Sequence, residues 1–160
     1  MENFTVSLFG HREIIDDFAV EDALDRIVRG LLREHTYIEF LIGRSGEFDE
    51  CAASVIKRAL RAMGEERGNL TLVLPYRVGE IRSYESYYHG VCIPDCVERV
   101  HPKGAFERRN RWMVDRADLL IVYVGRPSRG AYKTVLYAQK KGKSILNLYE
   151  EISAGDGRHR

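Results

Sequence analysis

The chain has 160 residues, of which 44% are hydrophobic and 31% are charged, and this is the size of about one domain of roughly 150 residues. Such a length buries enough apolar surface for a core without disulfides, which argues against disorder. Lysine and arginine total 25 against 24 for aspartate and glutamate, a formal net charge of +1, so no overall field attracts nucleic acid or membranes. The apolar runs are far shorter than the roughly 20 residues that cross a bilayer, and the acidic start does not resemble a signal peptide. We therefore expect a cytoplasmic protein with no membrane partner.

Cysteine and histidine usage gives no sign of a metal or redox site. The three cysteines, Cys51, Cys92 and Cys96, contain no Cys-x-x-Cys pair, because three residues separate the last two. The five histidines are scattered without a metal-ligand spacing. We therefore expect neither a metal ion nor a cofactor.

Apolar runs closed by glycine or proline alternate along the chain with segments of helical period. The runs predict strands over 4–9, 37–42, 70–74, 119–124 and 144–148. The helical spacing predicts helices over 22–34, 52–63, 105–116 and 131–141, the last of them ended by Gly142. Residues 76–104 indicate little beyond a helical turn and a short strand near 91–93, so we expect a long functional connection there. The polar tail, 151–160, is expected to be frayed.

This alternation predicts an α/β fold in which one domain, 1–150, holds an open, mainly parallel sheet covered by helices on both faces. Ligands of such sheets bind beyond the carboxyl ends of the strands. Four segments follow strands at that edge, and each contains glycine or arginine: 10–12, 43–49, 75–77 and 125–133.

The segment from Gly43 to Asp49, GRSGEFD, lies between a predicted strand and a predicted helix. Its glycines allow backbone N–H groups to approach an anion at the positive end of that helix. The spacing matches neither G-x-G-x-x-G nor a P-loop, and the alternative is a tight turn in which Asp49 caps the helix. Gly10, His11 and Arg12 place a cation and a titratable ring at the same edge.

The segment from Gly130 to Thr134, GAYKT, repeats the arrangement of a strand, a loop and a helix start. Basic residues near the two later helices favour a phosphate clamp: Arg108, Arg109, Arg111, Arg126, Arg129 and Lys133. The alternative is a solvated face, on which Arg111 pairs with Asp115 four residues later. Three aromatic residues are candidates for stacking on a base or for the core: Tyr76, Trp112 and Tyr132.

Seven motifs in register resemble one protein family. They are FGHR from Phe9, GRSGEFD from Gly43, VLP from Val73, RNRWMVD from Arg109, ADLLI from Ala117, GAYKTVLYA from Gly130 and KKGKSILNL from Lys140. In this order, over nearly the whole chain, they resemble the YpsA-like branch of the SLOG superfamily. The resemblance implies a Rossmann-like three-layer domain that binds a nucleotide and is often dimeric. Its relatives include the LOG phosphoribohydrolases, which cleave the base from a nucleoside monophosphate, and the DprA proteins, which bind single-stranded DNA.

The resemblance also implies roles for single residues. The arginine of the LOG motif R-K-x-x-M matches Arg109, but the LOG glutamate, three residues after the threonine of P-G-G-x-G-T, matches Tyr137. Cleavage of an N-glycosidic bond needs a carboxylate that stabilises charge on the sugar or activates water, and a phenol does not replace it. Glu47 has no structural duty evident from the pattern, so it is the candidate for a relocated carboxylate.

The leading hypothesis is a binding module for a nucleotide or a nucleotide-derived ligand. The expected ligand-binding residues are Gly10, His11, Arg12, Gly43, Arg44, Ser45, Gly46, Asp49, Arg109, Asn110, Gly130, Ala131 and Thr134. The alternative is a nucleoside 5'-monophosphate N-glycosidase that uses Glu47 and Arg109, and the second alternative is a single-stranded nucleic-acid binding protein. The resemblance further implies a homodimer.

Two structural expectations follow from the leading hypothesis. Arg12, Ser45, Asp49, Arg109 and Gly130 are expected to surround one cleft, although they are spread over more than 100 positions. Replacement of Arg109 by alanine is expected to weaken nucleotide binding far more than folding, because a charge-assisted contact is lost and little core is removed.

Overall fold

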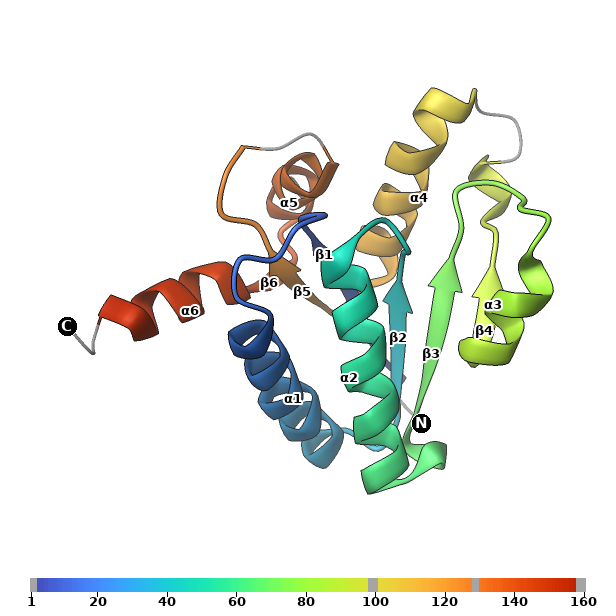
Figure 1. Cartoon of the computed structure of the whole chain (residues 1–160). Helices are drawn as coiled ribbons and strands as arrows, with labels where there is room; N and C mark the ends of the chain where they lie inside the picture. The colour runs from blue at the N-terminus through green and yellow to red at the C-terminus, as the bar shows by residue number, and fades with distance from the viewer. Residues whose placement is uncertain (1–2, 98–100, 128–129, 158–160) are drawn as a thin grey trace.

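The computed structural model describes residues 3–97, 101–127 and 130–157. Six parallel strands form one sheet in the order β4-β3-β2-β1-β5-β6 (Figure 1). The strands are β1 (Phe4–Gly10), β2 (Ile38–Ile42), β3 (Gly68–Val73), β4 (Gly90–Cys92), β5 (Leu119–Tyr123) and β6 (Ser144–Asn147). The helices are α1 (Asp17–Glu34), α2 (Glu47–Met63), α3 (Ile81–Tyr87), α4 (Pro102–Arg116), α5 (Gly130–Lys140) and α6 (Leu148–Gly157), with short 3₁₀ turns at Glu65–Arg67 and Asp95–Val97.

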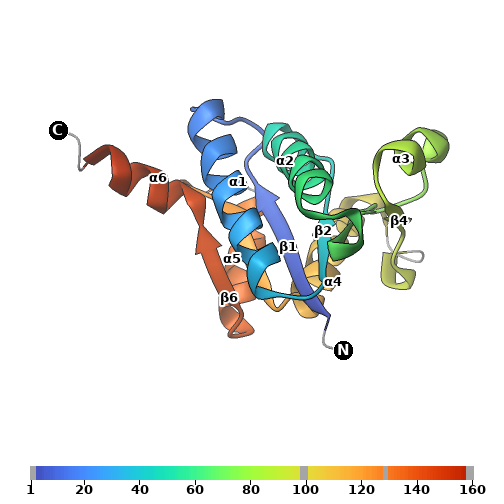
Figure 2. The same cartoon turned by 90° about the horizontal axis from the view of Figure 1, so that it is seen from below.

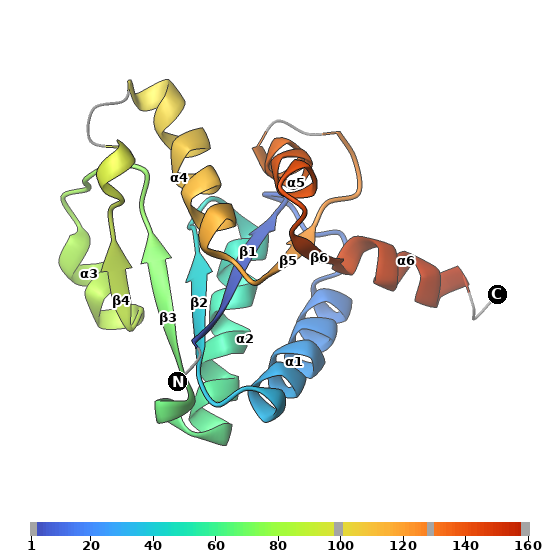
Figure 3. The same ribbon diagram turned by 180° about the vertical axis from the view of Figure 1, so that it is seen from behind.

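The helices make two layers around the sheet. Helices α1 and α2 cover the face seen in Figure 1, and α4 and α5 cover the opposite face, seen in Figure 3. Figure 2 shows the sheet between the two layers, with α3 beside β4 at one edge and α6 leaving from the other. The predicted fold class, a single-domain three-layer α/β fold of the Rossmann type, is confirmed.

Side chains alternate between the two faces of the sheet. In β1, Val6 and Leu8 pack with α1 and α2, whereas Phe9 packs with α4 and α5. Ser7 is fully buried on the α4 side, and its hydroxyl donates to the carbonyl of Met113 at 2.8 Å. A buried hydroxyl without a partner would destabilise the strand, so this bond accounts for a polar residue in the centre of the sheet.

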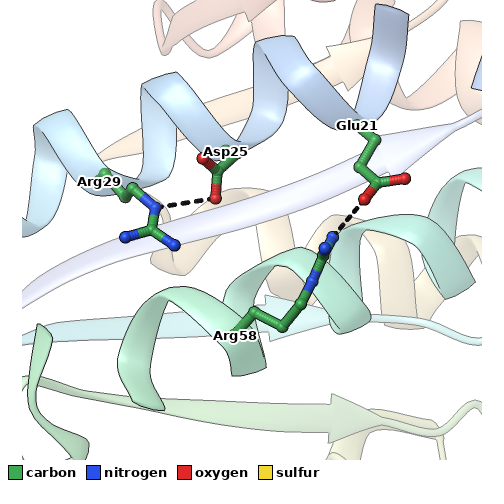
Figure 4. A network of polar contacts seen from close by, with 4 residues as sticks. All are labelled: Glu21, Asp25, Arg29 and Arg58. Carbon is green, nitrogen blue, oxygen red and sulfur yellow. Dashed lines mark hydrogen bonds and ion pairs between the residues drawn. The ribbon is translucent and has the colours of Figure 1, made fainter. Parts of the chain in front are cut away.

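One ion pair links the exposed surfaces of α1 and α2, and a second lies within α1 (Figure 4). Arg58 of α2 donates to Glu21 of α1 at 2.6 Å, and Arg29 pairs with Asp25 one turn away in α1 at 2.9 Å. These four side chains are 32–50% exposed, and pairs of that exposure contribute only about 0–1 kcal/mol each. The buried apolar residues of both helices therefore hold this layer on the sheet. Within the described residues, no helix combines the length and the apolar composition needed to cross a membrane.

All five main strands are present, and so are the helical turn and the short strand near 91–93 that were expected in the middle of the chain. The segment 76–104 contains α3 and a sixth strand, β4, which pairs in parallel with β3. Val91 of β4 and Ile93 after it pack against the core. The expected turn is thus a helix of seven residues, and the expected short strand runs over 90–92 and extends the sheet.

The first and the last helix, α1 and α6, also differ from the prediction. Helix α1 begins at Asp17 rather than Asp22, because Asp16 accepts a hydrogen bond from the Ala19 N–H at 3.0 Å and caps the helix. A frayed tail is expected after residue 150, but the structure has a helix to Gly157. Leu148 is fully buried and Ile152 packs against the core, which ties α6 to the domain.

Candidate functional site

The order in which strands are added to the sheet reverses at β1. From β1 it continues outward through β2, β3 and β4 on one side, while β5 and β6 lie on the other. The connections that follow β1, β2 and β5 therefore meet at the carboxyl edge, at the switch point where open α/β sheets bind ligands. A cavity of about 560 Å³ lies there. It is lined by Leu8, Phe9, Gly10, His11, Arg12, Glu13, Gly43, Ser45, Asp49, Phe106, Arg109, Asn110, Met113, Arg126, Gly130 and Ala131. We call this cavity the switch-point cleft.

The predicted convergence is confirmed. Arg12, Ser45, Asp49, Arg109 and Gly130 all line the switch-point cleft. Of the other expected residues, five line it as well: Gly10, His11, Gly43, Asn110 and Ala131. Their roles in binding a ligand stay a prediction.

Four of the expected residues do not line this cleft. The Arg44 guanidinium donates to the Tyr84 hydroxyl at 2.8 Å and lies over that ring, so it points to α3. The Thr134 hydroxyl is buried and donates to the Gly130 carbonyl one turn earlier in α5 at 3.0 Å. Gly46 lies behind the cleft wall, where a β-carbon would clash with the backbone of Arg12. The fourth is Glu47.

Glu47 fastens the loop after β1 to the start of α2. Its carboxylate accepts from the Ile14 N–H at 2.8 Å, and its own N–H donates to the Arg12 carbonyl at 2.8 Å. The side chain borders a different hollow, between α1 and α2. The structure therefore does not bring Glu47 beside Arg109, and the expectation of a catalytic pair made by these two residues is wrong. The role of Glu47 is to hold the loop after β1 through its hydrogen bond to Ile14. The sequence did not reveal this role, because the two residues are 33 positions apart.

Arg109 crosses the carboxyl edge of the sheet from α4. Its guanidinium donates through Nη1 to the Val73 carbonyl at the end of β3, at 3.1 Å, and through Nε to the Asn110 side-chain oxygen at 3.0 Å. Only 5% of the residue is exposed. The expectation that Arg109→Ala removes little core is therefore wrong.

Asp49 is the buried carboxyl group of the cleft. It lies in the first turn of α2, and its Oδ2 accepts from the Ser45 N–H at 2.9 Å. The N-cap of α2 is Gly46, so Asp49 closes the loop before the helix and is not its N-cap residue. Burial raises the pKa of Asp49 to about 6, against the opposing effects of the Ser45 hydrogen bond and the Arg109 charge.

Gly43 makes room for both charged groups. A β-carbon at this position would lie 3.0 Å from Nη1 of Arg109 and 3.3 Å from Oδ2 of Asp49. Both distances are shorter than ordinary van der Waals contact. The absence of a side chain at Gly43 thus leaves room for the close approach of Arg109 and Asp49 to the backbone after β2.

His11 joins the ends of β1 and β5. Its Nε2 accepts from the Gly125 N–H at 2.9 Å, which assigns the proton of the neutral ring to Nδ1. Burial, and then the positive charge of Arg126, lower the pKa of His11. The neutral ring therefore holds the loop that carries Arg126.

The charges of the cleft lining favour an anionic ligand. Three arginines, Arg12, Arg109 and Arg126, line it together with two carboxyl groups, Glu13 and Asp49. The first turns of α2 and α5 add the positive ends of two helix dipoles, since Asp49 and Gly130 belong to them. The chain as a whole has a net charge of only +1, so this positive character is local.

The predicted basic clamp is smaller than the sequence indicated. Arg108, Arg111 and Lys133 do not line the cleft, and Arg129 lies outside the described residues. Arg111 pairs with Glu107 at 2.8 Å rather than with Asp115, which accepts instead from the Tyr137 hydroxyl at 2.9 Å.

Sequence reasoning missed several lining residues, and two of them carried a usable signal. Glu13 directly follows the segment 10–12 that was singled out, and Phe106 lies one helical turn before Arg109. The others, Leu8, Phe9 and Met113, are buried core residues whose backbone or side chain reaches the floor of the cleft. Nothing in their pattern separates them from the rest of the core.

No family model and no curated protein matches the sequence of this chain. Solved structures do match. DNA processing protein A (DprA) from Streptococcus pneumoniae has a TM-score of 0.63 at 17% identity, covering 89% of this chain and 49% of that chain. The chain has the fold of that protein. The chain spans about half the length of that protein.

Two further solved structures have the same fold. DNA processing protein A from Helicobacter pylori, described for its single-stranded DNA binding mode, has a TM-score of 0.61 at 16% identity, covering 96% of this chain and 73% of that chain. The molybdenum cofactor binding protein from Rippkaea orientalis has a TM-score of 0.57 at 19% identity, covering 97% of this chain and 85% of that chain. These neighbours fit the SLOG-type fold that the seven motifs predict, while the YpsA-like branch stays a prediction.

Proposed function

We propose that the chain binds a nucleotide or a nucleotide-derived anion in the switch-point cleft. The observation that carries the proposal is the meeting of three arginines and two helix starts at one cleft of about 560 Å³, a volume in the range of small-molecule sites. Arg12 and Arg126 have exposed side chains there, so both are free to reach a phosphate group. Fold neighbours that bind a cofactor or single-stranded DNA support ligand binding as a function of this fold.

The test is a calorimetric titration with the four common nucleoside 5'-monophosphates, with the matching nucleosides and with a short oligothymidine. We expect a monophosphate to bind, the nucleoside to bind much more weakly, and Arg12→Ala and Arg126→Ala each to weaken binding about tenfold, the size of one hydrogen bond to a charged group. Arg33→Ala is the matched control, because Arg33 is exposed in the last turn of α1 and does not line the cleft. Tight binding of oligothymidine without binding of any monophosphate would favour the nucleic-acid alternative.

Cleavage of the N-glycosidic bond is the second candidate function, and the observation that favours it is Glu13. This exposed residue lines the cleft and follows Arg12 in the sequence, and the reaction needs a carboxylate. The same samples, analysed by chromatography, would then release free base, and Glu13→Gln would abolish that release. Binding without release leaves the chain as a binding module.

A further inference from the structure

One residue of the switch-point cleft, Phe106, belongs to an aromatic pair. Phe106 of α4 and Tyr76, which follows β3, meet edge to face, with ring centroids 5.8 Å apart and an interplanar angle of 84°. Both are large apolar side chains that remain exposed, Phe106 at 40% and Tyr76 at 44%. Exposed aromatic rings that border a cleft are typical of ligand contacts.

The Phe106 ring is held in place before any ligand arrives. Tyr76 packs against it, and the Arg109 guanidinium lies over it at 5.3 Å from the ring centroid. Arg109 is in turn fixed by its hydrogen bonds to Val73 and Asn110. A ring fixed in this way loses little conformational entropy when it contacts a ligand.

Polar groups beside the ring suit the edge of a heteroaromatic base. Asn110 lines the cleft and accepts from Arg109 through its side-chain oxygen. None of the described residues accepts from its amide nitrogen, so its two N–H donors face no protein acceptor in that part of the chain. Ring nitrogens and carbonyl oxygens of bases are acceptors for such donors.

We infer that Phe106 is the stacking platform for the planar ring of the ligand, with the phosphate directed toward Arg12 and Arg126 at the other part of the lining. The inference rests on the proposed function and assigns the two parts of the ligand to two parts of one cleft. It also makes Phe106 the residue that distinguishes a nucleotide from a phosphorylated sugar.

The experiment compares two ligands that share a phosphate and a ribose, a nucleoside 5'-monophosphate and ribose 5-phosphate, by calorimetric titration. The measured quantity is the ratio of their affinities. We expect the wild-type chain to favour the nucleotide, and Phe106→Ala to reduce the ratio about tenfold, the effect of one stacking contact. Ribose 5-phosphate binding is expected to be unchanged, which would show that the phosphate-binding part of the cleft is intact. Phe106→Trp is expected to restore the ratio.

Phe18→Ala is the matched control, because Phe18 is 81% exposed in α1 and does not line the switch-point cleft. An unchanged ratio in Phe106→Ala, or equal affinities for both ligands in the wild-type chain, would overturn the stacking platform and leave the proposed function standing. If the wild-type chain binds neither ligand, the proposed function fails and the stacking platform fails with it.

Discussion

At the scale of single residues, Asp49 and Arg109 are more deeply buried than a surface ligand site needs. Asp49 was expected in the cleft, with a helix cap as the alternative, and the structure places it in the cleft lining at 8% exposure. Arg109 was expected to be a dispensable phosphate ligand, yet it also bonds the end of β3. Arg109→Ala would remove the donor to the Val73 carbonyl and open space in a buried position, so the variant would lose stability as well as binding.

Asp49 makes the stability of the domain depend on pH. Folding raises its pKa from 3.8 to about 6, so the folded state holds the proton more tightly than the unfolded state. The stabilisation by the protonated group is present below about pH 4 and is lost as the pH rises through 6. The loss amounts to roughly 3 kcal/mol at most, since one pKa unit is about 1.4 kcal/mol.

The measurement is urea unfolding of the wild-type chain and of Asp49→Asn between pH 4 and pH 7. We expect the free energy of unfolding of the wild type, relative to the variant, to fall across this range and the variant to be the more stable at pH 7. His11 and the other titrating groups are shared, so their effects largely cancel in the difference. A difference that rises with pH would show that Arg109 stabilises the charged carboxylate more than burial destabilises it.

At the scale of elements, the turn between β2 and α2 depends on Gly43. A β-carbon there is tightly confined by Arg109 and Asp49, so Gly43→Ala is expected to destabilise the fold by about 1–3 kcal/mol and to weaken nucleotide binding. Gly30→Ala is the control, because Gly30 lies inside α1 with nothing within 4 Å of an added β-carbon. That substitution is expected to stabilise the chain by up to about 1 kcal/mol, the gain in helix propensity. Thermal unfolding of both variants tests these two expectations. Equal changes in stability for Gly43→Ala and Gly30→Ala would contradict them.

Comparison of the elements with the sequence shows which of them the local hydrophobic pattern can predict. The strands β1, β2, β3 and β5 were predictable because each is a mostly buried run rich in apolar residues. The edge strand β6 is less buried, and its apolar residues follow the helix stop at Gly142. The short elements α3 and β4 were expected only as a turn and a short strand, because seven and three residues are too few for a clear periodic signal. The contact of Glu47 with Ile14 joins the loop after β1 to the first residue of α2, and no local pattern reports such a contact.

At the scale of the whole molecule, alternation of strands and helices predicted the parallel sheet but not the order of its strands. The position of β1 between β2 and β5 creates the switch point, and the convergence of distant segments follows from it. The motifs at the strand ends therefore identified most of the cleft, whereas side-chain directions such as those of Arg44 and Glu47 required the structure. The homodimer implied by the family resemblance stays a prediction.

The central claim is that a nucleotide binds where the connections after β1, β2 and β5 meet. The most direct test is a titration of the ¹⁵N-labelled chain with a nucleoside 5'-monophosphate, followed through the backbone amide signals. We expect the largest shifts at 10–13, at Gly43 and Ser45, and at 130–131, which line the cleft from three separate segments. Shifts confined to the outer surface of α1 and α2, or to α3 and β4, would contradict the claim.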